Sequence, residues 1–194
     1  MTDEKAAAPL RARMGEARRN RQRLVEVATR AFGSDRPVTL AEIAAEAGVG
    51  IGTLYRHFPT REALVEAVYH DQVERLGRSA TELLAAHPPA EAFRRWLDVF
   101  VDWAATKHGM TDALRTAVSS GRLRHSEMRR QLETVVGRLL EAGAESGELR
   151  GDASAADVAA LLAGILSVAG APDQRDQARR LAALVADGLQ RASG

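Results

Sequence analysis

The run Gly50–His57 includes side chains whose chemistry suits contact with nucleic acid. Arg56 can form a bidentate contact with the edge of a guanine, and Thr53 can donate to a base or present its methyl group to thymine. Both project away from the apolar face that Leu54 and Phe58 form at helical spacing. For Arg56 taken alone, a phosphate contact or a surface ion pair is an equally good interpretation.

The start of the same predicted helix carries almost no side chains. Gly50 and Gly52 leave the backbone amides and the positive end of the helix dipole open to a phosphate. Ile51 between them is compatible with two roles, since it can complete the core or touch a thymine methyl group. These residues together predict a helix that reads DNA.

Two short helices across a tight turn must hold this run in place. Thr39 followed by Glu42 is a capping-box pattern, which satisfies two orphan amides at a helix start. Gly48 follows where a left-handed backbone costs glycine little. Between cap and turn, apolar residues recur at helical spacing: Leu40, Ile43, Ala44 and Ala47. This is the helix-turn-helix arrangement, whose second helix enters the major groove.

The N-terminal part of the chain is basic. Residues 1–17 are small and charged without periodicity, which predicts a disordered basic arm, and a first helix is expected from about Glu16 to Gly33. Residues 1–61 hold 11 Lys and Arg against 7 Asp and Glu, although the whole chain has a net charge of only +1. A basic front suits a phosphate-binding head, with Arg18 among the candidate contacts. A solvated tail that only aids solubility is the alternative.

The remaining sequence predicts helices only. Good helix formers dominate and β-branched alternation is almost absent, so we expect an all-α fold of about nine helices. The expected domains are the arm at 1–17, a three-helix helix-turn-helix domain at 18–64 and a larger helical bundle at 65–194. A long helix from Thr60 to about Ala86, ending before two prolines, should join the last two.

Several classes of site have no signature in the sequence. The chain has no cysteine and its five histidines are scattered, so no metal site and no cofactor are expected. No nucleophile–base pair or phosphate loop is evident, which argues against an enzyme. The N-terminus lacks the apolar region of a signal peptide, and the longest uncharged run is too short to cross a membrane. We expect a cytoplasmic protein.

A stripe of aromatic residues marks the helix that begins near Ala90. Phe93, Trp96, Phe100 and Trp103 recur at helical spacing, although aromatics make up only 4% of the chain. The stripe can wall a hydrophobic ligand pocket, or it can be a filled core helix. The candidate pocket residues are Trp96, Phe100, Trp103, His108, Met110, Leu114, His125 and Met128.

The motif T…IA..AGVGIGTLYRHFPTREAL resembles the DNA-binding domain of the TetR family of bacterial transcription regulators. The resemblance covers about Arg18 to Tyr69 and implies that Tyr55 and His57 contact phosphates. Thr39 would then both cap its helix and meet a phosphate. Arg61 stands where the family commonly has Lys, and its retained charge preserves a phosphate contact. Gly50 stands where Ser or Ala is common, which puts the detailed base contacts in doubt.

The resemblance also implies a partner for the last two helices. They should pair with their copies in a second subunit as a four-helix bundle, because such readers need two heads about one DNA turn, roughly 34 Å, apart. A wholly intramolecular core is the alternative. The candidate dimer residues are Val158, Leu161, Leu162, Ile165, Leu166, Leu181, Leu184, Val185 and Leu189.

The leading hypothesis is a homodimeric regulator, most simply a repressor, that binds a palindromic double-stranded DNA operator and is released by a small, partly hydrophobic effector. The alternative is a constitutive or architectural DNA-binding dimer without an effector, which a filled aromatic core would support. A third hypothesis, an enzyme whose helix-turn-helix only packs, has no catalytic signature behind it.

Overall fold

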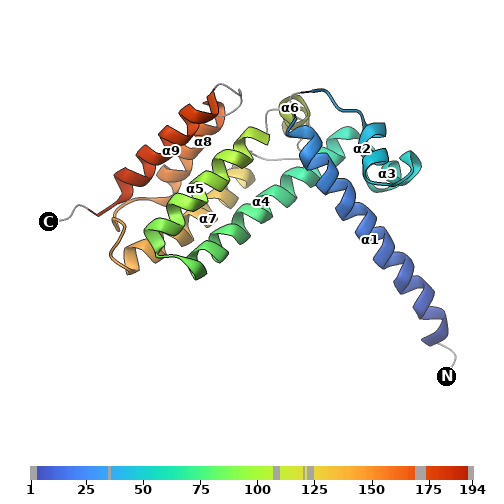
Figure 1. Cartoon of the computed structure of the whole chain (residues 1–194), viewed down its shortest axis with the longest axis horizontal. Coiled ribbons are helices and arrows are strands. Elements are labelled where there is room, and N and C mark those ends of the chain that lie inside the picture. The colour runs from blue at the N-terminus through green and yellow to red at the C-terminus, as the bar shows by residue number, and fades with distance from the viewer. Residues whose placement is uncertain are drawn as a thin grey trace.

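The computed structural model describes residues 4–34, 36–106, 110–119, 121, 125–168 and 174–191. These residues form nine α-helices and no strand, which confirms the all-α prediction. Figure 1 shows the arrangement. The helices are α1 (Glu4–Phe32), α2 (Leu40–Glu46), α3 (Ile51–His57), α4 (Arg61–Ala86), α5 (Pro89–Thr106), α6 (Thr111–Ser119), α7 (His125–Glu145), α8 (Ala155–Val168) and α9 (Arg175–Leu189).

The first helix is longer than the sequence pattern predicts. Its backbone is helical from Glu4, so most of residues 1–17, predicted to be a disordered arm, lies in a helix that projects from the molecule (Figure 1). The prediction relied on missing apolar periodicity and gave too little weight to the high helix propensity of Ala, Arg and Glu. The C-terminal half packs on the rest of the protein, through Leu24, Ala28 and Phe32.

Helix α4 connects the two parts of the fold. It packs on α1 and on α5, α6 and α7. The apolar face of α4 is buried along most of its length, from Leu64 and Val68 to Leu76 and Ala80. The expected domain boundary near residue 64 therefore falls inside one continuous helix, and a single buried cluster extends from α1 to α9.

The aromatic stripe of α5 forms the centre of the helical body. The rings of Trp96 and Phe100 lie 5.7 Å apart and those of Phe100 and Trp103 lie 5.5 Å apart. Trp103 in turn lies 6.4 Å from the ring of Tyr69 on α4. The indole Nε1 of Trp96 donates to the carbonyl of Leu76 over 3.0 Å, so this tryptophan fixes α5 against α4.

The loop between α7 and α8 is fixed at both ends. Gly147 adopts a φ of 76°, and the Arg150 amide donates to the carbonyl of Leu189 over 2.9 Å. The Glu148 side chain accepts from the backbone amide of Ala90 at the start of α5 over 2.9 Å. Beneath the loop, Leu149 is buried directly against Gly143 of α7, where there is no room for a Cβ atom.

Within the described residues, no helix is both long and apolar enough to cross a membrane. The same part of the chain holds no cluster of three His, Asp or Glu side chains that could bind a metal ion.

Candidate nucleic-acid interface

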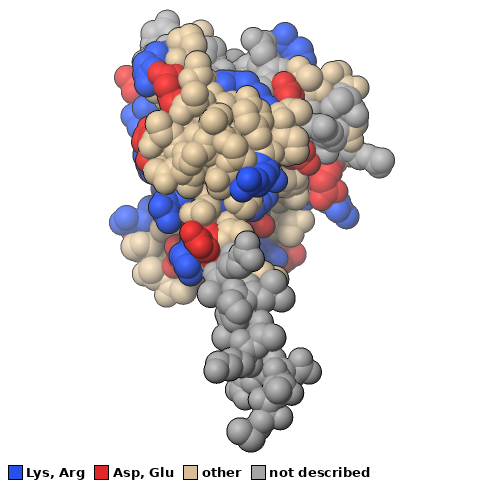
Figure 2. Space-filling model, turned by 90° about the vertical axis from the view of Figure 1, so that its right-hand side faces the viewer, with Lys and Arg blue, Asp and Glu red and all other residues tan. Residues whose placement is uncertain are grey.

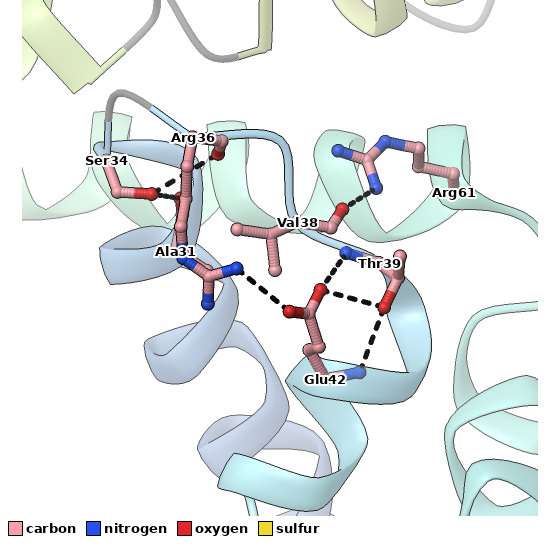
Figure 3. Close-up of polar contacts among 7 residues, drawn as sticks. All are labelled: Ala31, Ser34, Arg36, Val38, Thr39, Glu42 and Arg61. Atoms are coloured by element: carbon pink, nitrogen blue, oxygen red, sulfur yellow. Dashed lines mark hydrogen bonds and ion pairs between the residues drawn. The ribbon is translucent and has the colours of Figure 1, made fainter.

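The start of α2 is capped as the sequence predicts. The Glu42 amide donates to Thr39 Oγ1 over 3.2 Å, and the Thr39 amide donates to Glu42 Oε2 over 2.8 Å. Arg36 adds a third contact, with Nη1 2.9 Å from Glu42 Oε1 (Figure 3). The carboxylate of Glu42 thus joins the loop before α2 to the first turn of the helix.

These contacts shift the ionisation of Glu42. The hydrogen bond from Arg36, followed by those from Thr39, lowers the pKa of Glu42 from 4.5 to about 2. A lowered folded-state pKa means that the ionised cap stabilises the fold above the ordinary carboxyl pKa. That contribution is lost as the pH falls from about 4.5 toward about 2.

Replacing Glu42 with alanine should therefore lower stability in a pH-dependent way. We expect the difference in free energy of unfolding from wild type to be constant above about pH 5 and to shrink toward pH 2, because the wild-type carboxylate becomes protonated. Urea unfolding at several pH values measures it. Glu42→Gln, which can still accept a hydrogen bond but does not titrate, is the control. A difference independent of pH for Glu42→Ala would contradict this account of the cap.

The turn between α2 and α3 has the geometry of a helix-turn-helix. Gly48 has a φ of 67°, the left-handed region that favours glycine, and its amide donates to the carbonyl of Ala45 over 3.0 Å. The next amide, of Val49, donates to Ala44 over 3.0 Å. Leu54 and Ile43, each fully buried, belong to the same core and hold α3 in place.

The outer face of α3 carries the predicted DNA contacts. Tyr55 is 49% exposed and Ile51 43% exposed, and Gly52 and Arg56 are exposed as well. Thr53 and His57 are half-buried at the edges of this face. The exposure of Ile51 favours a surface role over a core role.

The predicted contacts outside α3 are also at the surface. Gly50 is the N-cap of α3, and Cβ atoms added there or at Gly52 would meet nothing within 4 Å. Thr39, the N-cap of α2, and Arg18 on α1 are exposed. Figure 2 views this end of the molecule, where Lys and Arg side chains lie around a largely uncharged central surface and acidic side chains are also present. A two-helix unit with these residues on its accessible face can bind DNA.

Arg61 has internal contacts that the sequence did not indicate. Its Nη1 donates to the carbonyl of Val38 over 2.7 Å (Figure 3). Its guanidinium lies 4.9 Å from the ring centroid of Phe32. Arg61 is in the first turn of α4, so it holds the loop before α2 against the helix that leads into the body. The predicted phosphate contact by this residue is the alternative to a positioning role, which these internal contacts favour.

The salt dependence of DNA binding separates the two roles of Arg61. We expect Arg61→Gln to weaken binding without changing the slope of log affinity against log salt, because the lost contacts are to Val38 and Phe32. Losing a phosphate contact would reduce that slope by about 0.9 per subunit. Fluorescence anisotropy at four salt concentrations measures it. Arg61→Lys, which keeps the charge, should restore part of the affinity, and a reduced slope for Arg61→Gln would assign the residue to phosphate.

Two further arginines on α1 hold the helix-turn-helix in position, through contacts that the sequence did not indicate. The guanidinium of Arg21 lies 5.2 Å from the ring centroid of Phe58, and Arg30 pairs with Glu46 over 3.0 Å. Each joins α1 to the helix-turn-helix. Since the partners are distant in sequence, no local spacing rule could have identified them.

A cavity of about 320 Å³, called here the main cavity, lies in the helical body between α4, α5, α7 and α8. Trp96, Trp103 and Met128 of the predicted pocket set line it. Phe100, Met110 and Leu114 are buried in the core and are not among its lining residues, whereas the side chains of His108 and His125 lie outside what the structure describes. The remaining lining residues are Tyr69, Val73, Leu76, Arg129, Gln131, Leu132, Val135, Ala159, Ala163 and Leu166.

Comparisons with known proteins agree with this arrangement. Residues 25–68 match the family described as "Bacterial regulatory proteins, tetR family", and residues 88–191 match "Transcriptional regulator SbtR-like, C-terminal domain". The chain is 46% identical to the TetR transcriptional regulator SCO0520 of Streptomyces coelicolor, whose structure aligns over 89% of this chain and 99% of that one with a TM-score of 0.78. The chain belongs to the TetR family of transcriptional regulators.

Other relatives extend the comparison. A TetR regulatory protein of Mycobacterium vanbaalenii is 36% identical, with 94% of this chain and 100% of that chain aligned at a TM-score of 0.70. A helix-turn-helix-type transcriptional regulator of Staphylococcus aureus is 41% identical over 51 residues. That match spans 25% of this chain and only 28% of the Staphylococcus protein, so the likeness to it is local. The family membership makes this chain a DNA-binding transcriptional regulator.

The TetR-family body also presents an apolar face on α8 and α9, at the end of the molecule opposite α2 and α3 (Figure 1). Leu161 is 58% exposed and Leu184 is 66% exposed. A groove of about 570 Å³ runs along this face. Of the predicted dimer residues, the groove is lined by Val158, Leu161, Ile165, Leu181, Leu184, Val185 and Leu189. By contrast, Leu162 is fully buried and Leu166 lines the main cavity.

Proposed function

We propose that this TetR-family protein is a homodimeric repressor that binds a palindromic operator and is released when a small effector enters the main cavity. The run Gly50–His57 of each subunit would enter one major groove, with Arg56 and Thr53 reaching base edges. Tyr55, His57 and Thr39 would contact phosphates, which fix the position of the head without reading sequence.

The observation that carries the proposal is that α4 belongs to both functional regions. Its first turn supplies Arg61, whose side chain contacts the loop before α2. Its middle supplies Tyr69, Val73 and Leu76 to the wall of the main cavity. A ligand that favours a different position of α4 therefore shifts the reading head as well, and it does so by its differential affinity for the two positions.

The apolar face of α8 and α9 supports a second copy of this chain as the partner. Leu161 and Leu184 are large, exposed and lie on the same groove, and clustered apolar surface of this kind marks an interaction site. On the same face, Cβ atoms added to Gly164 or Gly188 would meet nothing within 4 Å, so another helix can approach closely. A two-fold axis through this face would carry two heads, as a palindromic operator requires.

The test is selection of bound sequences from a random pool of duplex DNA at near-physiological salt. Salt has to be near physiological because non-specific phosphate binding captures DNA at low ionic strength. We expect enrichment of an inverted repeat with half-sites about one helical turn apart. Enrichment of a single half-site, or salt-sensitive binding without any enrichment, would contradict the dimeric operator reader.

A further inference from the structure

The residues around the main cavity restrict what it can hold. We infer that its ligand is an uncharged amphiphile, with an apolar ring-containing body in the main cavity and a hydrogen-bond donor at the end that reaches Gln131. This inference rests on the proposed ligand-responsive function and specifies the chemistry of the effector.

The walls of the main cavity indicate that the body of the ligand is apolar. Trp96 and Trp103 of α5 and Tyr69 of α4 line the cavity, and aliphatic residues complete most of the remainder. Flat aromatic walls favour a ring placed face or edge against them. The volume, about 320 Å³, is at the small end of the range of about 300–1,000 Å³ for small-molecule sites.

The polar and charged residues that line the main cavity indicate that the ligand is uncharged. No carboxylate is among the residues described as lining the main cavity, so a buried cation would have no counter-charge there. The charged residue in that lining is Arg129, which is exposed at its edge and offers little to an anion held against the tryptophans. An uncharged ligand avoids the cost of burying an unpaired charge.

The hydrogen-bond donor on the ligand is inferred from the side chain of Gln131. Its Oε1 is buried and has no hydrogen-bond partner among the described residues. An unpaired buried acceptor is unfavourable, and the terminal torsion of glutamine is soft enough to turn the amide toward a donor. A hydroxyl or amide N–H on the ligand would satisfy this oxygen.

A second cavity explains why the ligand should be polar only at that end. This space of about 270 Å³ between α4 and α7 shares Val73, Gln131 and Val135 with the main cavity. Its other lining residues are polar or charged: His70, Glu74, Thr134 and Arg138. Gln131 therefore stands at the boundary between apolar and polar space.

Three naphthalene probes test the inference on the full-length protein by isothermal titration calorimetry at pH 7. These are 2-naphthol, which carries a donor, 2-methoxynaphthalene, which does not, and the anion 2-naphthoate. We expect 2-naphthol to bind about tenfold more tightly than the ether, the effect of one neutral hydrogen bond, and 2-naphthoate to bind least. Equal or tighter binding of the ether, tightest binding of the anion, or no binding of any probe would overturn the inference.

Two matched variants on α7 locate the donor site. Gln131→Leu should reduce the naphthol-to-ether preference to about one, whereas Thr134→Val, which lies one turn further along and lines only the second cavity, should keep it. An unchanged preference of Gln131→Leu for 2-naphthol over the ether would show that Gln131 does not bind the donor. The comparison of probes on the wild-type protein decides the donor question even if Gln131→Leu does not fold.

A parallel measurement separates this inference from the proposed function. The affinity for the selected operator is measured with and without saturating 2-naphthol. Selective binding of 2-naphthol with unchanged operator affinity would refute ligand release and leave the ligand chemistry standing. If 2-naphthol and the ether weaken operator binding equally, ligand release would stand and the inferred ligand chemistry would be refuted.

Discussion

Replacing Leu184 with glutamate should convert the protein to a monomer and lower its affinity for a palindromic operator by about 10²–10⁴. Leu184 is 66% exposed on the face of α9 that we assign to the second copy, so a carboxylate there would have to lose its hydration in the dimer. The loss in affinity reflects the loss of linkage between two heads rather than any change in α3. Analytical ultracentrifugation measures the mass, and fluorescence anisotropy measures operator binding.

The control is Val99→Glu, which places the same charge at another exposed apolar residue, on α5. It should leave both the dimer and the operator affinity unchanged. A dimeric Leu184→Glu protein with normal operator binding would move the subunit interface away from α8 and α9.

Gly143→Ala should destabilise the fold by about 1–3 kcal/mol, the usual cost of overpacking a filled site. An added Cβ would overlap the Leu149 side chain and lie 2.8 Å from the Leu149 Cβ, close to the backbone, where the side chain cannot rotate away. Leu149 itself is in the loop that is hydrogen-bonded to the end of α9, so it has little freedom to move. Chemical denaturation measures the change.

Gly137→Ala on the same helix is the matched control. There an added Cβ would lie 3.7 Å from the Cβ of Ala155, an ordinary contact, so the higher helix propensity of alanine should raise stability by about 0.5–1 kcal/mol. Opposite signs for the two glycines are the expected result. Equal effects would show that the contact with Leu149 does not limit position 143.

The reading head could be predicted from the sequence because its determinants are local. The capping box joins Thr39 and Glu42, the left-handed turn needs Gly48, and the buried face repeats at helical spacing. Each of these depends on residues within a few positions of one another. The long helix predicted from Thr60 to about Ala86 and the helix predicted near Ala90 followed for the same reason, since a cap and two prolines mark their ends.

The cavity and the positioning arginines could not be predicted because they depend on helix–helix packing. The aromatic stripe of α5 indicated that a pocket was possible, yet spacing does not show which side of the helix faces empty space. Trp103 lines the cavity while Phe100, one turn away, is fully buried. Likewise, Arg61 reaches a carbonyl 23 residues earlier in the chain, at Val38. Contacts over such separations are set by the crossing of helices rather than by any motif.

The continuity of α4 gives it the geometry of a lever. At about 1.5 Å of rise per residue, its 26 residues span about 39 Å, and Arg61 lies about 22 Å from Leu76 in the cavity wall. A tilt of about 5° around Leu76 would therefore move Arg61 by about 2 Å, about twice the shift of Tyr69, which lines the cavity about 10 Å from Leu76. Two such arms in a dimer add their displacements. Under the proposed function, a compact ligand that shifts the cavity walls by a fraction of an ångström would then be sufficient to move two heads out of step with a DNA helix whose grooves repeat at about 34 Å.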